Sequence, residues 1–560
     1  MISRGGTTVL VAALVARAIG GATSLGAQIA GIPDGWASGS ISVSQELYGA
    51  SGIDPRRPGS TWRVQASPSL RLFGATSVGM ELLLSNDGAE FSQRLPQLGF
   101  EPHFAWGTAH LGDFSHDFGA YTLQGIRLRG AGLEVARGPV RASLQGGTSQ
   151  SAIATTLDGP VYRRTVYAAA VGVGAPERNS LDITIVRALD ALTPDERPFV
   201  DTLGLDTLAA DLRPQAFNRP QSGLVAAVAG SLALFEQALR VKGEVAGALL
   251  TRDRTSPRII VDSVAGAGIA TGLGDDFRLS SSGDLAWNVE GQFRARKLSL
   301  TAGMEQVGAG YSSLGVAYLV NDRRAWFAGG DVRLIGDRLQ LQGRVQKQKD
   351  NLLAQKQFTT LRDIYSASAV GRIGIASLAL TGARNMAAND AANDTLLVDN
   401  RASVLNAQVS VPWQVASRVI GLMGGVSWQQ NQDANPLRAI PAITVHTWNA
   451  GVTIPVGVVS VAPSINGVSS AGGGVEAQRN VVAGIRANAK LAEGRGSIGA
   501  GWNRSFVAAR EVSGATAQLG WTLPGDMRAS LVGRMQRYGA LGTRPSFRET
   551  YLTSSLSRSF

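Results

Sequence analysis

The feature that most limits the possible folds of this chain is an alternation of apolar and polar side chains with a period of two. It recurs in segments of about ten residues along most of the sequence. The segment 285–294 is an example, with Leu285, Trp287, Val289 and Phe293 on one side and Asn288, Glu290, Gln292 and Arg294 on the other. Successive side chains of a β-strand point to opposite faces, so this pattern predicts strands with one apolar and one polar face.

The connections between these segments are of two kinds that follow one another in turn. Short turns occur at 296–297, 336–337 and 524–526, whereas longer polar stretches run over 86–102, 189–221, 251–283 and 347–362. A soluble β-sandwich would also alternate, but short turns at one end and long loops at the other are typical of strands that cross a membrane. We therefore predict an all-β fold, a transmembrane antiparallel β-barrel of about 24–26 strands with no separate plug domain.

The strand count depends on one region. We expect about 26 strands between residues 40 and 560, including strands over 104–113, 119–129 and 131–137. If 113–132 is instead a loop excursion, the count is about 24. Either even number places both ends of the barrel on the side of the short turns.

The first 27 residues have the features of a secretory signal peptide. Arg4 precedes a short apolar run from Thr8 to Ile19, and small residues follow up to Ala27. A membrane anchor is disfavoured because the run is shorter than ~20 residues and Arg17 interrupts it. We expect residues 28–39 to form a short periplasmic tether and residues 40–560 to form the barrel.

Composition supports an exported barrel. The chain has 69 Gly and no Cys, which excludes disulfides, a lipoprotein anchor and thiol catalysis. Its mean hydropathy of +0.04 is what a wall with one lipid-facing and one water-facing side would average. The net charge of +11 does not indicate nucleic-acid binding, because an exported protein is not expected to encounter nucleic acid.

The last strand, 548–560, carries a further signal. Leu552, Leu556 and Phe560 share one face, and the chain ends on an aromatic residue. This strand resembles the C-terminal strand of bacterial outer-membrane β-barrels, although Arg558 departs from that pattern. The resemblance implies that these three residues form the signal read by the barrel-insertion machinery. It also implies a location in the outer membrane of a Gram-negative-type bacterium, in contact with outer-membrane lipid.

Four segments extend the resemblance to uncharacterised, porin-like outer-membrane barrel proteins. They are YTLQGIRLRGAGLEVARGPVRASLQGG (121–147), YRRTVYAAAVGVG (162–174), GAGYSSLGVAYLVNDRRAW (308–326) and KDNLLAQKQFTT (349–360). The resemblance implies the fold and the compartment, and brings no substrate and no active-site residue with it.

The polar faces are rich in basic residues. Alternation predicts lumen-facing side chains at Arg127, Arg129, Arg240, Lys242, Arg294, Arg296, Arg333, Arg344, Arg486, Lys490, Arg528 and Arg534. A charge at the lipid midplane costs about 2–4 kcal/mol, which supports their inward placement. Such a wall would favour anionic solutes, unless the basic groups are paired with acidic groups across strands.

No catalytic motif is present, and we predict no catalytic residue, no metal site and no cofactor. His103, His110 and His116 cluster near Asp113 and Asp117, but their spacing matches no familiar set of metal ligands. Polar residues at a strand end are the simpler interpretation. His446 lies in a strand pattern and is expected to face the lumen.

These observations predict a porin-like channel for the passive passage of small solutes, with a mild preference for anions and no enzymatic activity. Loops such as 189–221 or 251–283 would narrow the passage. The alternative is a wide structural, secretion or assembly-associated barrel whose lumen is filled by its own loops or by a partner protein.

Overall fold

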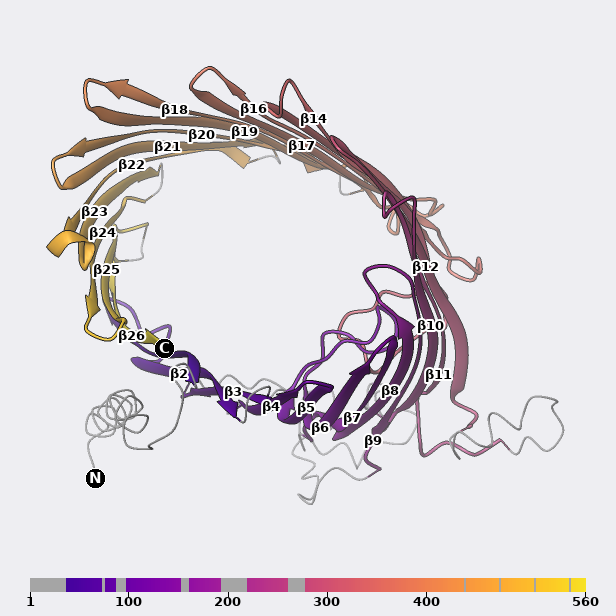
Figure 1. The fold of residues 1–560 in the computed structure, drawn as a ribbon. Helices are drawn as coiled ribbons and strands as arrows, with labels where there is room; N and C mark the ends of the chain where they lie inside the picture. The colour runs from indigo at the N-terminus through magenta and orange to yellow at the C-terminus, as the bar shows by residue number, and fades with distance from the viewer. Residues whose placement is uncertain are drawn as a thin grey trace, which may run out of the picture.

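The computed structural model describes residues 37–72, 76–86, 97–152, 161–192, 219–259, 277–437, 440–472, 475–507, 510–542 and 545–560. These residues form one antiparallel sheet of 26 strands, which closes on itself because β1 pairs with β26 (Figure 1). The predicted fold class, a transmembrane-type antiparallel barrel without a separate plug domain, is confirmed for this part of the chain.

The strands follow one another in chain order around the ring. Their bounds are β1 (Ala37–Ser51), β2 (Ser60–Leu72), β3 (Thr76–Ser85), β4 (Gln97–Phe104), β5 (Gly107–Phe114), β6 (Leu128–Arg137), β7 (Val140–Gln150), β8 (Arg164–Gly174), β9 (Ser180–Asp190), β10 (Ser222–Leu234), β11 (Leu239–Thr251), β12 (Ser281–Ala295), β13 (Leu298–Val307), β14 (Arg323–Leu334), β15 (Leu339–Asp350), β16 (Thr360–Ile373), β17 (Ala376–Asn389), β18 (Asp399–Val415), β19 (Arg418–Asp433), β20 (Ile440–Val456), β21 (Val459–Gly472), β22 (Val475–Leu491), β23 (Gly496–Val507), β24 (Val512–Leu523), β25 (Met527–Tyr538) and β26 (Phe547–Ser559).

The seam between the first and last strands is continuous. Pairing runs from Ser40↔Ser559 to Ser51↔Arg548. Beyond it, the Phe560 N–H donates to the Gly39 carbonyl over 3.0 Å, and the Gly39 N–H donates back over 2.7 Å. Closure leaves no strand edge open to lipid or to another chain.

The two ends of the barrel differ. Turns of two to five residues, such as 105–106, 296–297 and 374–375, join strands at one end, and most of the connections at the other end are longer. The tight turns use positive-φ residues, for example Gly374 (φ 59°) and Gly457 (φ 60°), where a side chain would be strained. Both Ala37 and Phe560 lie at the short-turn end, as predicted.

Two strand predictions were wrong, and their errors cancel in the count. The segment 119–129 is not a strand, because residues 115–127 leave the wall as a loop and β6 begins at Leu128. The missing strand is β4, which begins inside the stretch 86–102 that was expected to be a loop. The barrel also begins at Ala37 rather than at residue 40, and the expected signal peptide over 1–27 lies outside the described residues.

The outer surface of the wall is apolar. Leu144, Ile183 and Val245 are 65 %, 53 % and 55 % exposed, and each sits between strand neighbours that turn the other way. No helix among the described residues is long and apolar enough to cross a membrane. A closed barrel with an apolar outer belt is suited to span a bilayer through its strands.

Close backbone approach at Gly130 generates a stability prediction. A Cβ at this position in β6 would lie 2.0 Å from the Gly146 carbonyl oxygen and 2.5 Å from the Gly147 Cα of β7. Gly130→Ala should therefore force the two strands apart and destabilise the barrel by about 1–3 kcal/mol. The measurement is the urea midpoint of the heat-modifiable folded band. Gly49→Ala, whose Cβ would meet nothing within 4 Å, is the matched control and should leave the midpoint unchanged.

Candidate functional site

Two loops from the long-loop end fold into the ring instead of continuing outward (Figure 1). They are residues 115–127, between β5 and β6, and residues 308–322, between β13 and β14. The loops contact each other: the Gln124 N–H donates to the Gly315 carbonyl over 2.9 Å, and the Tyr311 hydroxyl donates to the Tyr121 carbonyl over 2.9 Å. We call them the inward loops.

The inward loops pack on the wall through apolar side chains. Leu123 is buried with Val166 and Val186 of β8 and β9, while Tyr121 and Tyr311 are buried with residues of β10 to β13. This explains the wrong strand prediction, because an alternating apolar pattern packs as well on a barrel's inner wall as on lipid.

Glu244 of β11 fixes the first inward loop in place. Its carboxylate accepts the N–H of Ala120 over 3.0 Å and that of Tyr121 over 3.4 Å, and Glu244 is only 8 % exposed. Its neighbour Val245 lies on the apolar outer surface. Even-numbered residues of β11 therefore face the lumen.

The register extends this assignment around the ring, because directly paired residues of neighbouring strands share a face. Glu244 pairs with Asn288, and Asn288 pairs with Glu305. Val245 pairs with Trp287 on the outer surface. Following the pairs from strand to strand assigns an inner and an outer face to all 26 strands.

Nine of the twelve predicted basic residues share the inner face with Glu244. They are Arg240, Lys242, Arg294, Arg333, Arg344, Arg486, Lys490, Arg528 and Arg534. Arg127 lies in the loop before β6, and Arg296 lies in the turn 296–297. Arg129 lies on the face opposite to the buried Leu128, which packs with Leu123 of the inward loop. A role of any of these residues in solute passage stays a prediction.

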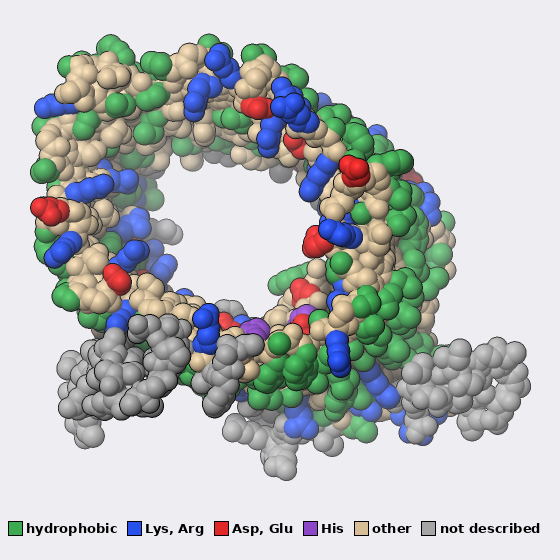
Figure 2. Space-filling model, viewed as in Figure 1, with side chains coloured by type: hydrophobic (Ala, Val, Ile, Leu, Met, Phe, Trp, Pro, Cys, Tyr) green, Lys and Arg blue, Asp and Glu red, His purple; other side chains and the backbone are tan. Residues whose placement is uncertain are grey.

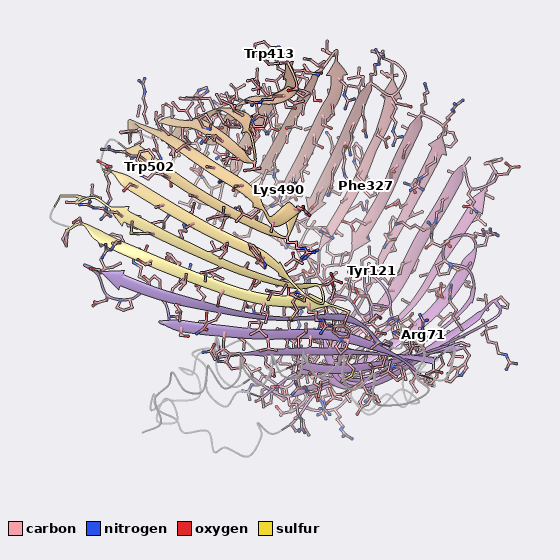
Figure 3. All side chains as sticks on the ribbon, turned by 60° about the vertical axis from the view of Figure 1, so that its left-hand side comes forward. Arg71, Tyr121, Phe327, Trp413, Lys490 and Trp502 are labelled. Atoms are coloured by element: carbon pink, nitrogen blue, oxygen red, sulfur yellow. The ribbon has the colours of Figure 1, made fainter. Side chains whose placement is uncertain are left out.

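The same register corrects or refines other placements. His446 pairs with Trp428 and shares the outer face with it, so the expectation that His446 faces the lumen was wrong. Trp413 and Trp502, both labelled in Figure 3, also lie on the outer face. Leu552 and Leu556 share that face, opposite Leu47 and Val43 of β1, and their role in insertion stays a prediction.

Several inward basic residues in the first half of the barrel are held by carboxylates, whereas Arg294 and Arg333 form no ion pair with a described residue. Lys242 lies 3.2 Å from Glu290, and Arg127 lies 3.1 Å from Glu81. Similar pairs along β7 to β11 join Arg141 to Asp182, Arg164 to Asp190, and Arg240 to Glu177. At close range these pairs largely cancel each other's charge.

Lumen-facing basic residues on β15 to β25 lack such partners, although Lys347, Arg401 and Arg504 elsewhere in that half form ion pairs. Arg486, Lys490, Arg528 and Arg534 form no ion pair with any described residue, and Arg344 stacks over Phe327 with 4.6 Å to the ring centroid. The described inner faces of β15 to β25 otherwise carry mainly Ser, Thr, Asn, Gln, Gly and aliphatic side chains. Their inward carboxylates are Asp350 and Asp433, both at the loop ends of their strands. Figure 2 shows Lys and Arg side chains along much of the edge of the opening.

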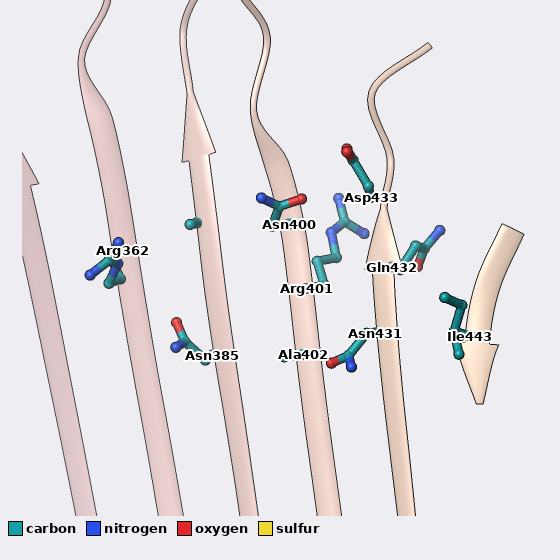
Figure 4. Close-up of a pocket in the computed structure, with 10 residues that line it drawn as sticks. Arg362, Asn385, Asn400, Arg401, Ala402, Asn431, Gln432, Asp433 and Ile443 are labelled. Carbon is teal, nitrogen blue, oxygen red and sulfur yellow. The ribbon is translucent and has the colours of Figure 1, made fainter. Parts of the chain in front are cut away.

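A polar pocket lies on this second half, near the long loops (Figure 4). It spans β16 to β20, and its lining includes the guanidinium of Arg362 and the amides of Asn385, Asn400 and Asn431. The carboxylate of Asp433 lines the same pocket. The three neutral amides and the guanidinium can donate several hydrogen bonds to a carboxylate or a hydroxyl group.

The second inward loop is anchored to its neighbour by Asp322. Its carboxylate accepts the N–H of Leu352 over 2.8 Å and of Asn351 over 3.2 Å, and Lys356 lies 2.5 Å away. Burial alone would raise the pKa of Asp322. The hydrogen bonds from Lys356 and the two backbone groups outweigh that effect and hold the pKa below its ordinary value of 3.8.

The structure brings two of the three clustered histidines together. His110 and His116 both contact Glu134 of β6, whereas His103 bonds Thr108 and stands apart. Asp113 pairs with Arg129, and Asp117 accepts the Gly125 N–H. Sequence reasoning missed Glu134, although its even position on β6 places it on the same inner face as His110.

No protein-family model matches this chain, and no curated protein matches it. Solved structures with some likeness include a P pilus usher (PapC) translocation pore, at 10 % identity and a TM-score of 0.30, covering 94 % of this chain and 99 % of that one. An E. coli P pilus tip assembly intermediate gives 10 % identity and a TM-score of 0.47, covering 94 % of this chain and 61 % of that one. Pseudomonas aeruginosa OccK2 in complex with glucuronate has 12 % identity and a TM-score of 0.29. The match covers 94 % of this chain and 98 % of that one. Likeness at this level says nothing about what this chain carries.

The chain's own geometry leads to a general conclusion. A closed barrel with an apolar outer belt belongs in a bacterial outer membrane, since single-chain barrels of this kind reside there. The described residues leave an opening through the middle of the ring, and its edge is lined with polar and charged groups (Figure 2). The described chain is therefore a closed, membrane-type β-barrel with an opening lined by polar and charged groups.

Glu244→Ala should release the first inward loop. Two buried N–H groups would lose their acceptor, at a cost of about 1.5–3 kcal/mol for bonds to a charged group. We expect faster cleavage by trypsin at Arg127, which lies at the end of that loop, in the folded protein. Ser530→Ala on the inner face of β25 is the control, and cleavage equal in the two variants would contradict the anchoring role.

Asp322 gives a prediction with a defined pH window. A carboxyl whose pKa is lowered on folding stabilises the folded state at neutral pH, and this contribution disappears as pH falls below its ordinary value of 3.8. Asp322→Asn imitates the protonated form and should speed hydrogen exchange of the Asn351 and Leu352 amides about tenfold at pH 7. Asp350→Asn, whose carboxylate lies 3.7 Å from Lys356, should change them little.

Proposed function

We propose that the protein is a passive channel for small anionic solutes, which move along the inner wall formed by β15 to β25. The observation that carries this proposal is the separation of charge within the lumen. Most of the predicted basic groups in the first half lie beside carboxylates, with Arg294 and Arg333 as exceptions, whereas none of Arg344, Arg486, Lys490, Arg528 and Arg534 has an ion pair among the described residues.

Unpaired cations act over a longer range than ion pairs. The field of a close ion pair falls off steeply, while that of a lone guanidinium extends over about a Debye length, ~8 Å at physiological salt. A solute that follows the second half of the wall would therefore meet a positive potential, which the inward carboxylates Asp350 and Asp433 offset only at the loop ends of their strands.

The polar pocket on β16 to β20 supports the same preference. It combines Arg362 with the amides of Asn385, Asn400 and Asn431 close to the long loops. A carboxylated, hydroxylated solute could exchange part of its hydration shell for these donors as it enters. Such exchange allows binding that is weak enough for release.

The test is ion selectivity of the refolded protein in a planar bilayer under a salt gradient. The triple variant Arg486→Gln, Lys490→Gln, Arg534→Gln should lower the anion-to-cation permeability ratio at least about twofold. The control is Lys242→Gln with Glu290→Gln, which removes a neutral pair and should leave the ratio unchanged. A triple variant with wild-type selectivity would refute the anion preference.

The width of the barrel favours a second candidate. With about 4.8 Å between strands and a tilt of about 40°, a ring of this strand number is about 50 Å across at the backbone. The inward loops cover one side of that space, so a partner protein could fill the rest of the lumen. Protein extracted in mild detergent would then copurify with a stoichiometric partner and conduct ions only after that partner is removed.

A further inference from the structure

The contacts of His110 and His116 with Glu134 point to a binding site for a divalent transition-metal ion such as Zn²⁺ on the lumen wall. His110 Nε2 lies 2.6 Å and His116 Nδ1 lies 2.9 Å from the same oxygen of Glu134. One ligand atom from each of the three residues lies within 4.8 Å of the other two. Two imidazoles and a carboxylate are among the ligand sets that zinc prefers.

The fit to a metal requires only small movements. Zinc binds nitrogen and oxygen at about 2.0–2.2 Å, so tetrahedral ligand atoms stand roughly 3.3 Å apart. The two histidine nitrogens would move outward from Glu134 by less than about 1 Å and toward each other from a separation of at most 4.8 Å. Each nitrogen that now donates a proton to Glu134 would lose it to solvent as the ion binds. Side chains of His116 and Glu134 are about one-third exposed, which leaves room for a water as fourth ligand.

An outer partner orients the first ligand. His110 Nδ1 lies 3.2 Å from a carboxylate oxygen of Glu101 on β4. Metal-bound histidines usually donate their second ring N–H to a carboxylate, which fixes the tautomer and leaves the other nitrogen free to bind. Here that bond would direct the lone pair of His110 Nε2 at the space between Glu134 and His116.

The surrounding structure holds the three groups at this spot. His110 is 7 % exposed and stacks with Phe114 at 5.2 Å between ring centroids, and His116 meets the ring of Phe118 edge-on at 5.2 Å. The Gln145 side chain donates to the His116 carbonyl over 3.3 Å. Figure 2 shows histidine beside acidic side chains at the edge of the opening, where an ion could enter from the lumen.

One ligand lies on an inward loop and the other two lie on the wall. His116 begins the segment 115–127, while His110 and Glu134 belong to β5 and β6. A bound ion would therefore tie the base of this loop to the strands on either side of it. The site is independent of the anion preference proposed above, because none of its residues belongs to the unpaired basic set.

The experiment is titration of the full-length, refolded barrel with Co²⁺, whose visible absorption reports a tetrahedral site, followed by displacement with Zn²⁺. We expect one Co²⁺ per chain in the wild type, and affinity at least about 100-fold lower in His116→Ala and in Glu134→Gln. Glu101→Gln should keep the site but weaken it by about 10–100-fold. Heat-modifiability confirms that each variant is folded.

His103→Ala is the matched control, because this histidine lies on the same wall and bonds Thr108 instead of Glu134. It should bind Co²⁺ as the wild type does. A folded wild-type protein without stoichiometric Co²⁺ binding would overturn the proposal. Equal binding in the wild type and in His116→Ala would also overturn it.

Discussion

The rest of the structure depends on the hydrogen-bonded seam between β1 and β26. A bilayer core offers no water to unpaired backbone groups, and each group left unsatisfied there costs several kcal/mol. The chain meets this constraint by pairing its first described strand with its last, up to the bonds between Gly39 and Phe560. Closure also fixes every register in the ring. The inner or outer position of each strand side chain is therefore a consequence of closure rather than of local sequence alone.

The lumen-facing side chains of the two halves of the barrel differ in how their charges are paired. Among the described residues, the carboxylates of the first half hold basic side chains, backbone N–H groups or histidines at short range. Glu244 binds a loop, Glu290 binds Lys242, and Glu134 binds two histidines. Such groups contribute little to the field further away. In the proposed anion channel, selectivity would be governed by the lumen-facing basic residues of the second half, which form no ion pair with a described residue.

Sequence reasoning found the fold because the period-two signal and the chain-closing strand are both visible without a structure. It failed where two environments produce the same pattern. Tyr121 and Leu123 alternate with polar residues as a lipid-facing strand would, but they are buried against the inner wall. That error moved the start of β6 and placed Arg129 on the wrong face. The cluster around Glu134 was out of reach, since it depends on which residues of β5 and β6 stand opposite each other.

Strand number sets the size of the ring, but the inward loops set the shape of the space inside it. A loop that is not hydrogen-bonded into the sheet stays buried only if other groups accept hydrogen bonds from its buried N–H groups. Otherwise it would be more stable exposed to water. Glu244 of β11 supplies them to the first inward loop, and Asp284 of β12 accepts the Gly310 N–H of the second over 2.8 Å. Each loop is thus held by a carboxylate of the wall, by apolar contacts with the wall and by hydrogen bonds to the other loop. A metal ion at His116 would add a further attachment at the base of the first loop, so the free space beside that wall would depend on ion concentration as well as on covalent structure.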